Sequence, residues 1–106
     1  MLNQIVLVGR LVDDPVIEEM EDKKYCRITI AVLRSYKNEN GEYDTDLIPI
    51  TLWNGIAENT KEYCKKGDLI GVKGRIQSKE NDIEIVAEKI TFLTSKKENE
   101  MAKDDE

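Results

Sequence analysis

Five stretches of the chain have the apolar pattern of β-strands: residues 2–12, 25–36, 47–53, 70–76 and 83–93. Apolar and polar side chains alternate most regularly in residues 25–36, where every second residue from Cys26 to Val32 would face a core. In the last stretch the apolar phase changes near Glu88 and Lys89, which predicts a bulge or a switch of the buried face.

Turn residues separate these stretches. Asn40 and Gly41 are the strongest short signal for a β-hairpin, and residues 79–82 predict a second tight hairpin. Gly9 lies inside the first stretch, which predicts a bulge or the close approach of another backbone. Pro49 is expected to interrupt the third stretch, because proline cannot donate a backbone hydrogen bond. Residues 16–20 are expected to pair only weakly, and residues 18–24 to form a charged loop or hairpin tip.

One segment between the third and fourth stretches has helical spacing instead. Four residues at i, i+4, i+7 and i+8 would form a narrow, mostly apolar face: Ile56, Thr60, Tyr63 and Cys64. Asn54 is expected to cap the N-terminus through its side-chain oxygen. Gly67, which follows two lysines, is expected to end the helix with a positive φ.

The order of these elements predicts an all-β fold. Five strands with one short helix between the third and fourth are the order of an OB-fold, a five-stranded Greek-key barrel. Another small β-barrel with a capping helix is the alternative. We expect residues 1–94 to form this single domain, and residues 95–106 to be a short disordered acidic tail because they contain almost no apolar side chains.

Composition and charge narrow the classes of function. The chain has 106 residues, 36% of them charged, and a formal net charge of −6. An acidic protein is a poor candidate for binding duplex DNA by extensive phosphate neutralisation. Binding of single strands needs only one basic groove, because stacking on aromatic rings supplies part of the affinity. No apolar run approaches the roughly 18 residues that span a bilayer, and no signal peptide is recognised, so we expect no membrane partner and a cytoplasmic protein, nucleoid-associated when bound to DNA.

No catalytic or metal-binding constellation is present in the sequence. The chain has no histidine, and its two cysteines, Cys26 and Cys64, are too isolated for a disulfide framework or a metal site. Gly71 and Gly74 flank Lys73 without forming a phosphate-binding loop. We therefore expect a protein that is not an enzyme and that uses no cofactor.

Basic residues near aromatic residues are the candidate chemistry. They lie at the ends of the second, third and fourth strands, which could share one outer face of a barrel: Arg34, Tyr36, Lys37, Trp53, Arg75 and Lys79. A base can stack on the ring of Trp53 or Tyr36 while the cations contact phosphates. The alternative is that Trp53, the only tryptophan, plugs the barrel.

Several segments in the same order resemble the bacterial single-stranded DNA-binding proteins. They are MLNQIVLVGRL, ITIAVLRSYKNENGEYDTD and KKGDLIGVKGRIQ, within a match that covers roughly residues 1 to 93. The resemblance implies an OB-fold, binding of single-stranded DNA without sequence preference, and a role in replication, recombination or repair. It also implies that Trp53 and Tyr36 stack on bases, that the basic residues above contact DNA, and that Lys66 matches a lysine before the turn glycine.

The chain also departs from the pattern of that family. Leu47 occupies a position that is usually aromatic, and the hairpin at residues 79–82 is shorter than is typical. Replication or repair proteins stay open as partners, although the last residues, 101–106, lack the hydrophobic pair that partner proteins grip in the family. These departures motivate a second hypothesis, an OB-fold protein-interaction module with weak or lost DNA binding.

The first strand suggests that the chain assembles with itself. Ile5, Val6, Leu7 and Val8 follow one another, which is more apolar surface than one small barrel can cover. The family resemblance implies a homotetramer in which first strands pair. We expect a homo-oligomer through this strand, with a tetramer or a dimer as its form.

Overall fold

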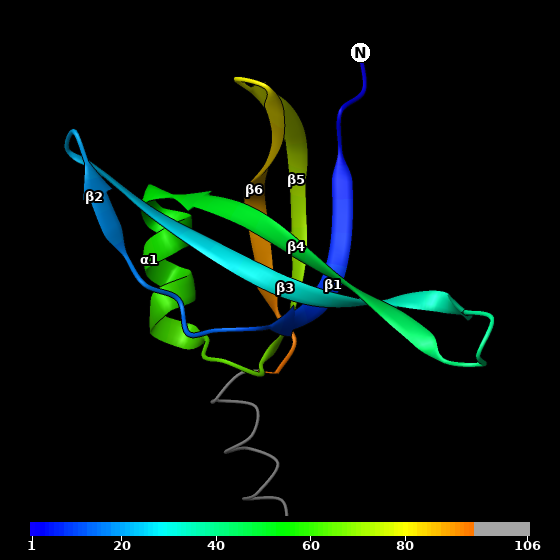
Figure 1. Cartoon of the computed structure of the whole chain (residues 1–106). Helices are drawn as coiled ribbons and strands as arrows, with labels where there is room; N and C mark the ends of the chain where they lie inside the picture. Colours follow the sequence, from blue (N-terminus) through cyan, green and yellow to red (C-terminus); the bar gives the residue numbers. More distant parts are fainter. Residues whose placement is uncertain (95–106) are drawn as a thin grey trace, which may run out of the picture.

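Seven elements form in the computed structural model, which describes residues 1–94 of the chain (Figure 1). In chain order they are β1 (Ile5–Leu11), β2 (Glu18–Met20), β3 (Lys23–Lys37), β4 (Tyr43–Trp53), α1 (Asn54–Tyr63), β5 (Leu69–Lys79) and β6 (Asp82–Phe92). The predicted tail, residues 95–106, lies outside the described residues. Among the residues described, no helix has the length and apolar character needed to cross a membrane.

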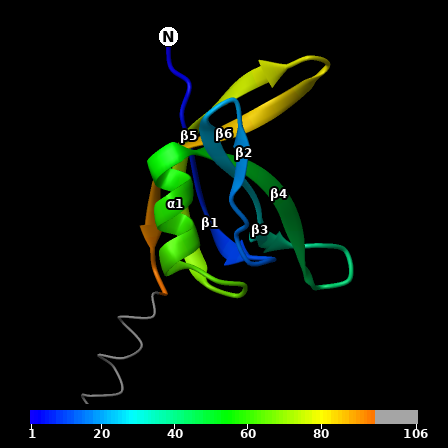
Figure 2. The same ribbon diagram turned by 90° about the vertical axis from the view of Figure 1, so that its left-hand side faces the viewer.

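The strands form one closed barrel. Their order in the sheet is β1-β5-β6-β4-β3-β2, and an additional pairing of β1 with β3 closes it. The three-residue strand β2 pairs only with the beginning of β3 and takes no part in closing the barrel. Five strands therefore make the barrel, as the sequence predicted. The helix α1 lies between β4 and β5 in the chain and covers one end of the barrel (Figure 2). The weak pairing expected for residues 16–20 is confirmed by β2.

Two ladders dominate the barrel, and they meet at a narrow junction. β3 and β4 pair from Tyr25 opposite Trp53 towards the hairpin at Gly41. β5 and β6 pair along nearly their whole lengths. Between these two hairpins, β4 and β6 share a single parallel pair, Thr51 with Val86. The two β-hairpins therefore meet directly at this short junction, and β1, which pairs with both β5 and β3, joins them on the other side of the barrel.

The alternation predicted for β3 decides which side chains fill the barrel. Cys26, Ile28 and Ile30 are almost completely buried. Their partners come from the inward faces of the other strands and from α1: Leu11, Ile50, Leu52, Ala57, Cys64, Ile70, Val72 and Ala87. Because Leu52 points inward, Trp53 at the next position points outward.

Two predicted irregularities are confirmed. Between Lys73 and Gly74 the register of β5 against β6 shifts, which leaves Glu88 as an extra residue, the bulge that the phase change indicated. At Gly9 the two backbones come close, since an added Cβ would lie 2.6 Å from the carbonyl oxygen of Ala31. Glycine lets β1 cross from β5 to β3 at this point.

Pro49 does not interrupt β4, in contrast to the prediction. The strand continues through it, and Pro49 lies opposite Thr29 of β3. A proline fits a strand where its missing N–H would face away from a neighbouring strand. Within residues 1–94, the other edge of β4 is paired only at Thr51, so no strand at this edge requires a hydrogen bond from residue 49.

The expected N-cap and part of the expected helix face are wrong. Trp53 occupies the N-cap position without a side-chain hydrogen bond. Asn54 has a φ of 49°, and its Oδ1 accepts a hydrogen bond of 3.4 Å from the backbone N–H of Lys24. Ala57 is buried beside Thr60, as the small residue that lets the helix approach the barrel. Tyr63, the last residue of the helix, is 52% exposed, and the centroid of its ring lies 5.8 Å from that of Phe92.

Candidate functional site

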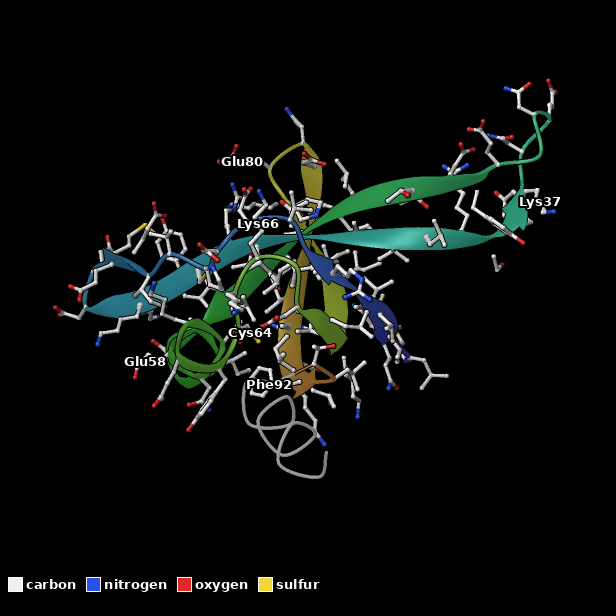
Figure 3. The ribbon with its side chains drawn as sticks, turned by 90° about the horizontal axis from the view of Figure 1, so that it is seen from below. Lys37, Glu58, Cys64, Lys66, Glu80 and Phe92 are labelled. Carbon is white, nitrogen blue, oxygen red and sulfur yellow. The ribbon has the colours of Figure 1, made fainter. Side chains whose placement is uncertain are left out.

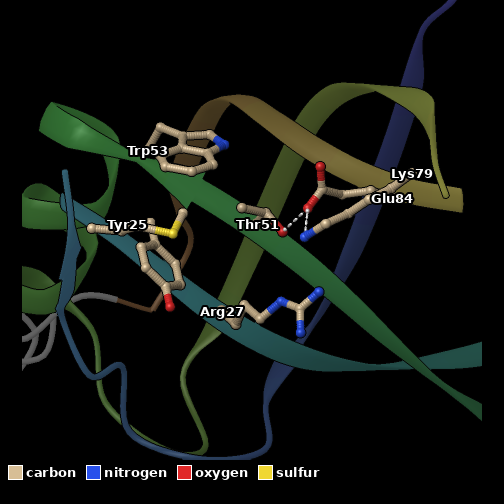
Figure 4. A pocket seen from close by; sticks show the side chains of 7 residues that line it. Tyr25, Arg27, Thr51, Trp53, Lys79 and Glu84 are labelled. Atoms are coloured by element: carbon tan, nitrogen blue, oxygen red, sulfur yellow. Dashed lines mark hydrogen bonds and ion pairs between the residues drawn. The ribbon is translucent and has the colours of Figure 1, made fainter. Parts of the chain in front are cut away.

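A pocket of about 190 Å³ opens on the outer face of the barrel, next to the β4–β6 junction (Figure 4). Residues from β2, β3, β4, β5 and β6 line it: Met20, Tyr25, Arg27, Thr51, Trp53, Lys79 and Glu84. The two aromatic rings lie at one end, and the charged groups lie at the other. The pocket thus combines flat apolar surfaces with both cations and a carboxylate.

The aromatic end follows from the register of the β3–β4 ladder. Tyr25 pairs with Trp53, and Arg27 pairs with Thr51, so the four side chains project from the same face of the sheet. The ring centroids of Tyr25 and Trp53 are 5.5 Å apart and their planes are inclined by 43°. Since Trp53 is half-buried on this outer face, it does not plug the barrel.

The polar end is organised around Glu84 on β6. Its Oε2 accepts hydrogen bonds from Thr51 Oγ1 at 3.0 Å and from Lys79 Nζ at 3.5 Å. Its Oε1 accepts one from Gln77 Nε2 at 2.9 Å. The Glu84 side chain is only 8% exposed. Burial by itself raises the pKa of Glu84, but the hydrogen bonds from Thr51 and Gln77 and the Lys79 ammonium lower the pKa further, so the net pKa lies below its usual value.

The two basic residues predicted on β5 have different positions. Lys79 lines the pocket. Arg75 does not, but its Nη2 donates to Gln77 Oε1 at 3.3 Å, and its Nη1 lies 3.4 Å from Glu88 Oε2. Arg75 is therefore linked through Gln77 to the pocket carboxylate.

Arg27 is a cation that the sequence reasoning did not single out. It lines the pocket opposite Thr51 and is exposed. None of the ion pairs formed within residues 1–94 includes Arg27. Its guanidinium is therefore available to an anionic ligand at the pocket rim.

The structure does not bring the end of β3 to Trp53, contrary to the expectation of one shared face for three strand ends. In an antiparallel ladder the end of β3 lies beside the beginning of β4, on an arm that projects from the barrel (Figure 1). Lys37 lies at the tip of this arm (Figure 3), and its Nζ lies 5.9 Å from the centroid of the Tyr43 ring. Tyr36, beside it, is 64% exposed. These residues form a region separate from the pocket.

Arg34 lies in the same arm and is held by carboxylates. Its Nη2 lies 2.8 Å from Asp46 Oδ1, its Nε also donates to Asp46, and its Nη1 lies 3.6 Å from Asp44. The hydrogen bond from Arg34 and its charge lower the pKa of Asp46. An anionic ligand would have to compete with these carboxylates for Arg34.

Lys66 lies in the turn between α1 and β5 and does not line the pocket (Figure 3). Its backbone N–H donates a hydrogen bond of 2.7 Å to Asp14 Oδ1. The neighbouring Gly67 has the predicted positive φ, 92°, but it does not end the helix, because α1 ends at Tyr63 with Cys64 as its C-cap and Gly67 lies in the turn that follows. The backbone of Lys66 therefore has a role in holding this turn.

Comparisons with known proteins agree on one family. The model of the single-strand binding protein family matches residues 2–94. The chain is 41% identical over 108 residues to "Single-stranded DNA-binding protein 1" of Clostridium acetobutylicum, an alignment that covers 92% of this chain and 98% of that protein. It is 42% identical over 106 residues to "Single-stranded DNA-binding protein B" of Bacillus subtilis, with 91% and 94% covered.

A solved structure has the same fold. It is the crystal structure of a deletion mutant of the single-stranded DNA binding protein from Thermus aquaticus, with a TM-score of 0.70 and 24% sequence identity. The match covers 88% of this chain and 51% of that one. This likeness concerns the fold alone, and it confirms the predicted OB-fold over a different small barrel.

Proposed function

Because this chain belongs to the single-strand binding protein family, we propose that it binds single-stranded DNA of any sequence, on the strands exposed in replication, recombination or repair. The observation that carries the proposal is the pocket that places Trp53 and Tyr25 beside Arg27 and Lys79. Flat rings next to cations are what sequence-tolerant binding of single strands needs.

The binding mechanism follows from the two ends of the pocket, one aromatic and one charged. One base stacks on the Trp53 ring, which contributes about 1–3 kcal/mol for a base–aromatic stack. Arg27 and Lys79 contact the phosphates on either side of that base. The net charge of −6 is compatible with this arrangement, because only the groove that follows the backbone has to be basic.

The β3–β4 arm extends the binding surface beyond the pocket. Its outward-facing residues include Leu47, which is 64% exposed, and Tyr36 and Lys37 lie at its end. A DNA strand that leaves the pocket along the β3–β4 arm would meet apolar side chains first, and then Tyr36 and Lys37 at the end of the arm. We include Arg34, Arg75 and Lys66 as weaker phosphate contacts, since Arg34 and Arg75 already pair with carboxylates.

Titration with oligo(dT) tests the proposal directly. Trp53 is the only tryptophan, so quenching of its fluorescence reports on the pocket itself. We expect quenching at micromolar protein in low salt, with poor competition by duplex DNA of the same length. If Arg27 and Lys79 make the main phosphate contacts, the slope of log K against log salt should be about −1.4. Absence of quenching in low salt would contradict the proposal.

A second function, a protein-interaction module with weak or lost DNA binding, is favoured by one observation. Arg34, Arg75 and Lys79 each lie within ion-pair distance of a carboxylate, which reduces the positive charge available to phosphates. The titration separates the two functions, because a module without DNA binding would leave the fluorescence of Trp53 unchanged, and a weakly binding one would show quenching only far above micromolar protein.

We infer further that the chain forms a homo-oligomer through β1, as a tetramer or a dimer. Within residues 1–94, this strand pairs from Ile5 to Gly9 only with β5, and its other edge is joined to β3 only from Arg10 onwards. Val6 and Val8 on its outer face are 68% and 51% exposed. An open strand edge with exposed apolar side chains favours pairing with a second copy.

Sedimentation should therefore show a mass well above the 12.2 kDa of one chain at tens of micromolar protein. Replacing Val6 and Val8 together by lysine should shift the protein to monomers, because like charges of two copies would then face one another where their β1 strands meet. Val16→Lys, at an equally exposed valine outside β1, serves as the control and should leave the mass unchanged. A wild-type monomer at these concentrations would overturn the inference.

A further inference from the structure

Base stacking does not require the carboxylate of Glu84 that lines the pocket. A negative charge beside the path of a phosphate backbone opposes DNA binding, and its side chain, 8% exposed, lies at the polar end of the pocket. Figure 4 shows its carboxylate bonded to both Thr51 and Lys79, across the pocket from the ring of Trp53. The position suggests a contact with the edge of the base rather than with the backbone.

The size of the pocket limits what can reach this carboxylate. At about 190 Å³ it is smaller than the roughly 300–1,000 Å³ of pockets for drug-sized ligands. One pyrimidine ring stacked on Trp53 fills such a space, with the sugar and phosphates outside. The far edge of that ring would then face Thr51 and Glu84.

The hydrogen bonds of Glu84 fix the carboxylate and leave it one open acceptor position. Thr51 and Lys79 donate to Oε2, whereas only Gln77 donates to Oε1. A carboxylate oxygen has two lone pairs, so Oε1 can accept one more donor. Because these donors also keep the pKa of Glu84 low, the group is ionised at neutral pH and can only accept.

We propose that Glu84 reads the edge of the base stacked on Trp53 and favours cytosine over thymine. The N4 amino group of cytosine is a donor that Glu accepts well, whereas thymine presents its O4 acceptor at the same position. This inference rests on the proposed function and adds a base preference to otherwise sequence-tolerant binding. Such preferences ordinarily come from stacking strength and backbone flexibility, so a hydrogen-bonded one is distinctive.

Glu84 also has a structural role, because its bond to Thr51 ties β6 to β4. A purely structural role predicts that Glu84→Gln weakens the binding of all bases equally. The reading role predicts a change in preference, because glutamine replaces one acceptor oxygen by an N–H₂ donor that suits the O4 of thymine.

The test compares oligo(dC) with oligo(dT) of equal length at neutral pH, followed by Trp53 fluorescence. The wild type should bind oligo(dC) at least about fivefold more tightly, the lower end of what one specific base contact provides. Glu84→Gln should abolish or invert this ratio. Glu58→Gln should keep it, since Glu58 is an exposed residue on α1 that pairs with Lys24 outside the pocket.

A second measurement needs no variant. An oligonucleotide of N4,N4-dimethylcytosine keeps the cytosine ring but has no N4 donor, so it should bind the wild type about as weakly as oligo(dT). Equal binding of oligo(dC) and oligo(dT) by the wild type would overturn the role of Glu84 while leaving the proposed function intact. Failure to bind either oligonucleotide would overturn the proposed function, and the inference with it.

Discussion

Trp53→Ala should weaken the binding of oligo(dT) by about 1–3 kcal/mol, a factor of roughly 5 to 150 in Kd. The indole ring lies on the outer face of β4, half-buried and 5.5 Å from Tyr25, so its removal takes away the stacking surface but no part of the barrel core. The variant has no tryptophan, so fluorescence anisotropy of a labelled oligonucleotide is the suitable measurement.

Two further variants show whether the loss comes from stacking. Trp53→Phe should recover most of the affinity, because it keeps a flat ring at the same position. Tyr63→Ala removes an exposed aromatic ring outside the pocket and should leave the affinity unchanged. If Trp53→Ala binds as tightly as the wild type, or if its weaker binding is matched by unfolding in circular dichroism, the assignment of Trp53 as the stacking platform fails.

Gly74→Ala should destabilise the fold by about 1–3 kcal/mol or more, the cost of overpacking a site that cannot relax. A Cβ at this position would overlap the backbone carbonyl of Val86 on β6. The obstacle is backbone in the β5–β6 ladder, next to the bulge at Glu88, and it cannot move aside without loss of strand pairing. Urea unfolding at fixed protein concentration measures the change.

Gly71→Ala is the matched control for this effect. Gly71 lies on the same strand, and the atom nearest to its added Cβ would be Thr91 Cβ at 3.7 Å, an ordinary packing distance. We expect a free energy of unfolding that is unchanged or slightly higher, because alanine restricts the unfolded chain. Equal urea midpoints for the two variants would show that a Cβ at position 74 does not destabilise the fold by overlap with Val86.

The fold could be predicted because its signals are local. Alternation in residues 25–36 identified the inward face of β3, and Asn40-Gly41 identified the hairpin that follows. The errors at Pro49 and Asn54 have a different origin. Whether a proline interrupts a strand depends on what lies at its other edge, and the side chain of Asn54 bonds to Lys24, thirty residues earlier in the chain. Neither neighbour can be inferred from residues nearby in the sequence.

The pocket could be predicted only in part. Trp53 was evident as a lone aromatic residue at a strand end. Tyr25 and Arg27 could have been found as well, because a hairpin centred on Asn40-Gly41 places the end of β4 opposite the beginning of β3. Counting along that hairpin also separates Arg34 from Trp53, which the sequence reasoning overlooked.

Glu84 had no comparable signal. Its importance comes from the packing of the β5–β6 hairpin against β4, where its carboxylate meets a hydroxyl 33 positions away in the chain. One more acidic residue in a chain that is 36% charged carries no information about this contact. Only the closure of the barrel reveals it.

The single parallel pair between β4 and β6 connects DNA binding with the internal motion of the barrel. Opening a region costs least free energy where few pairings hold it. Within residues 1–94, the ladder between β4 and β6 has one backbone pair, Thr51 with Val86, and the side-chain bond from Thr51 to Glu84 supports it. The pocket spans the junction, with Trp53 on one hairpin and Glu84 on the other. A base bound in the pocket as proposed would contact both hairpins. By linkage, we then expect binding of DNA to slow amide exchange at this junction and to raise the resistance of the barrel to unfolding.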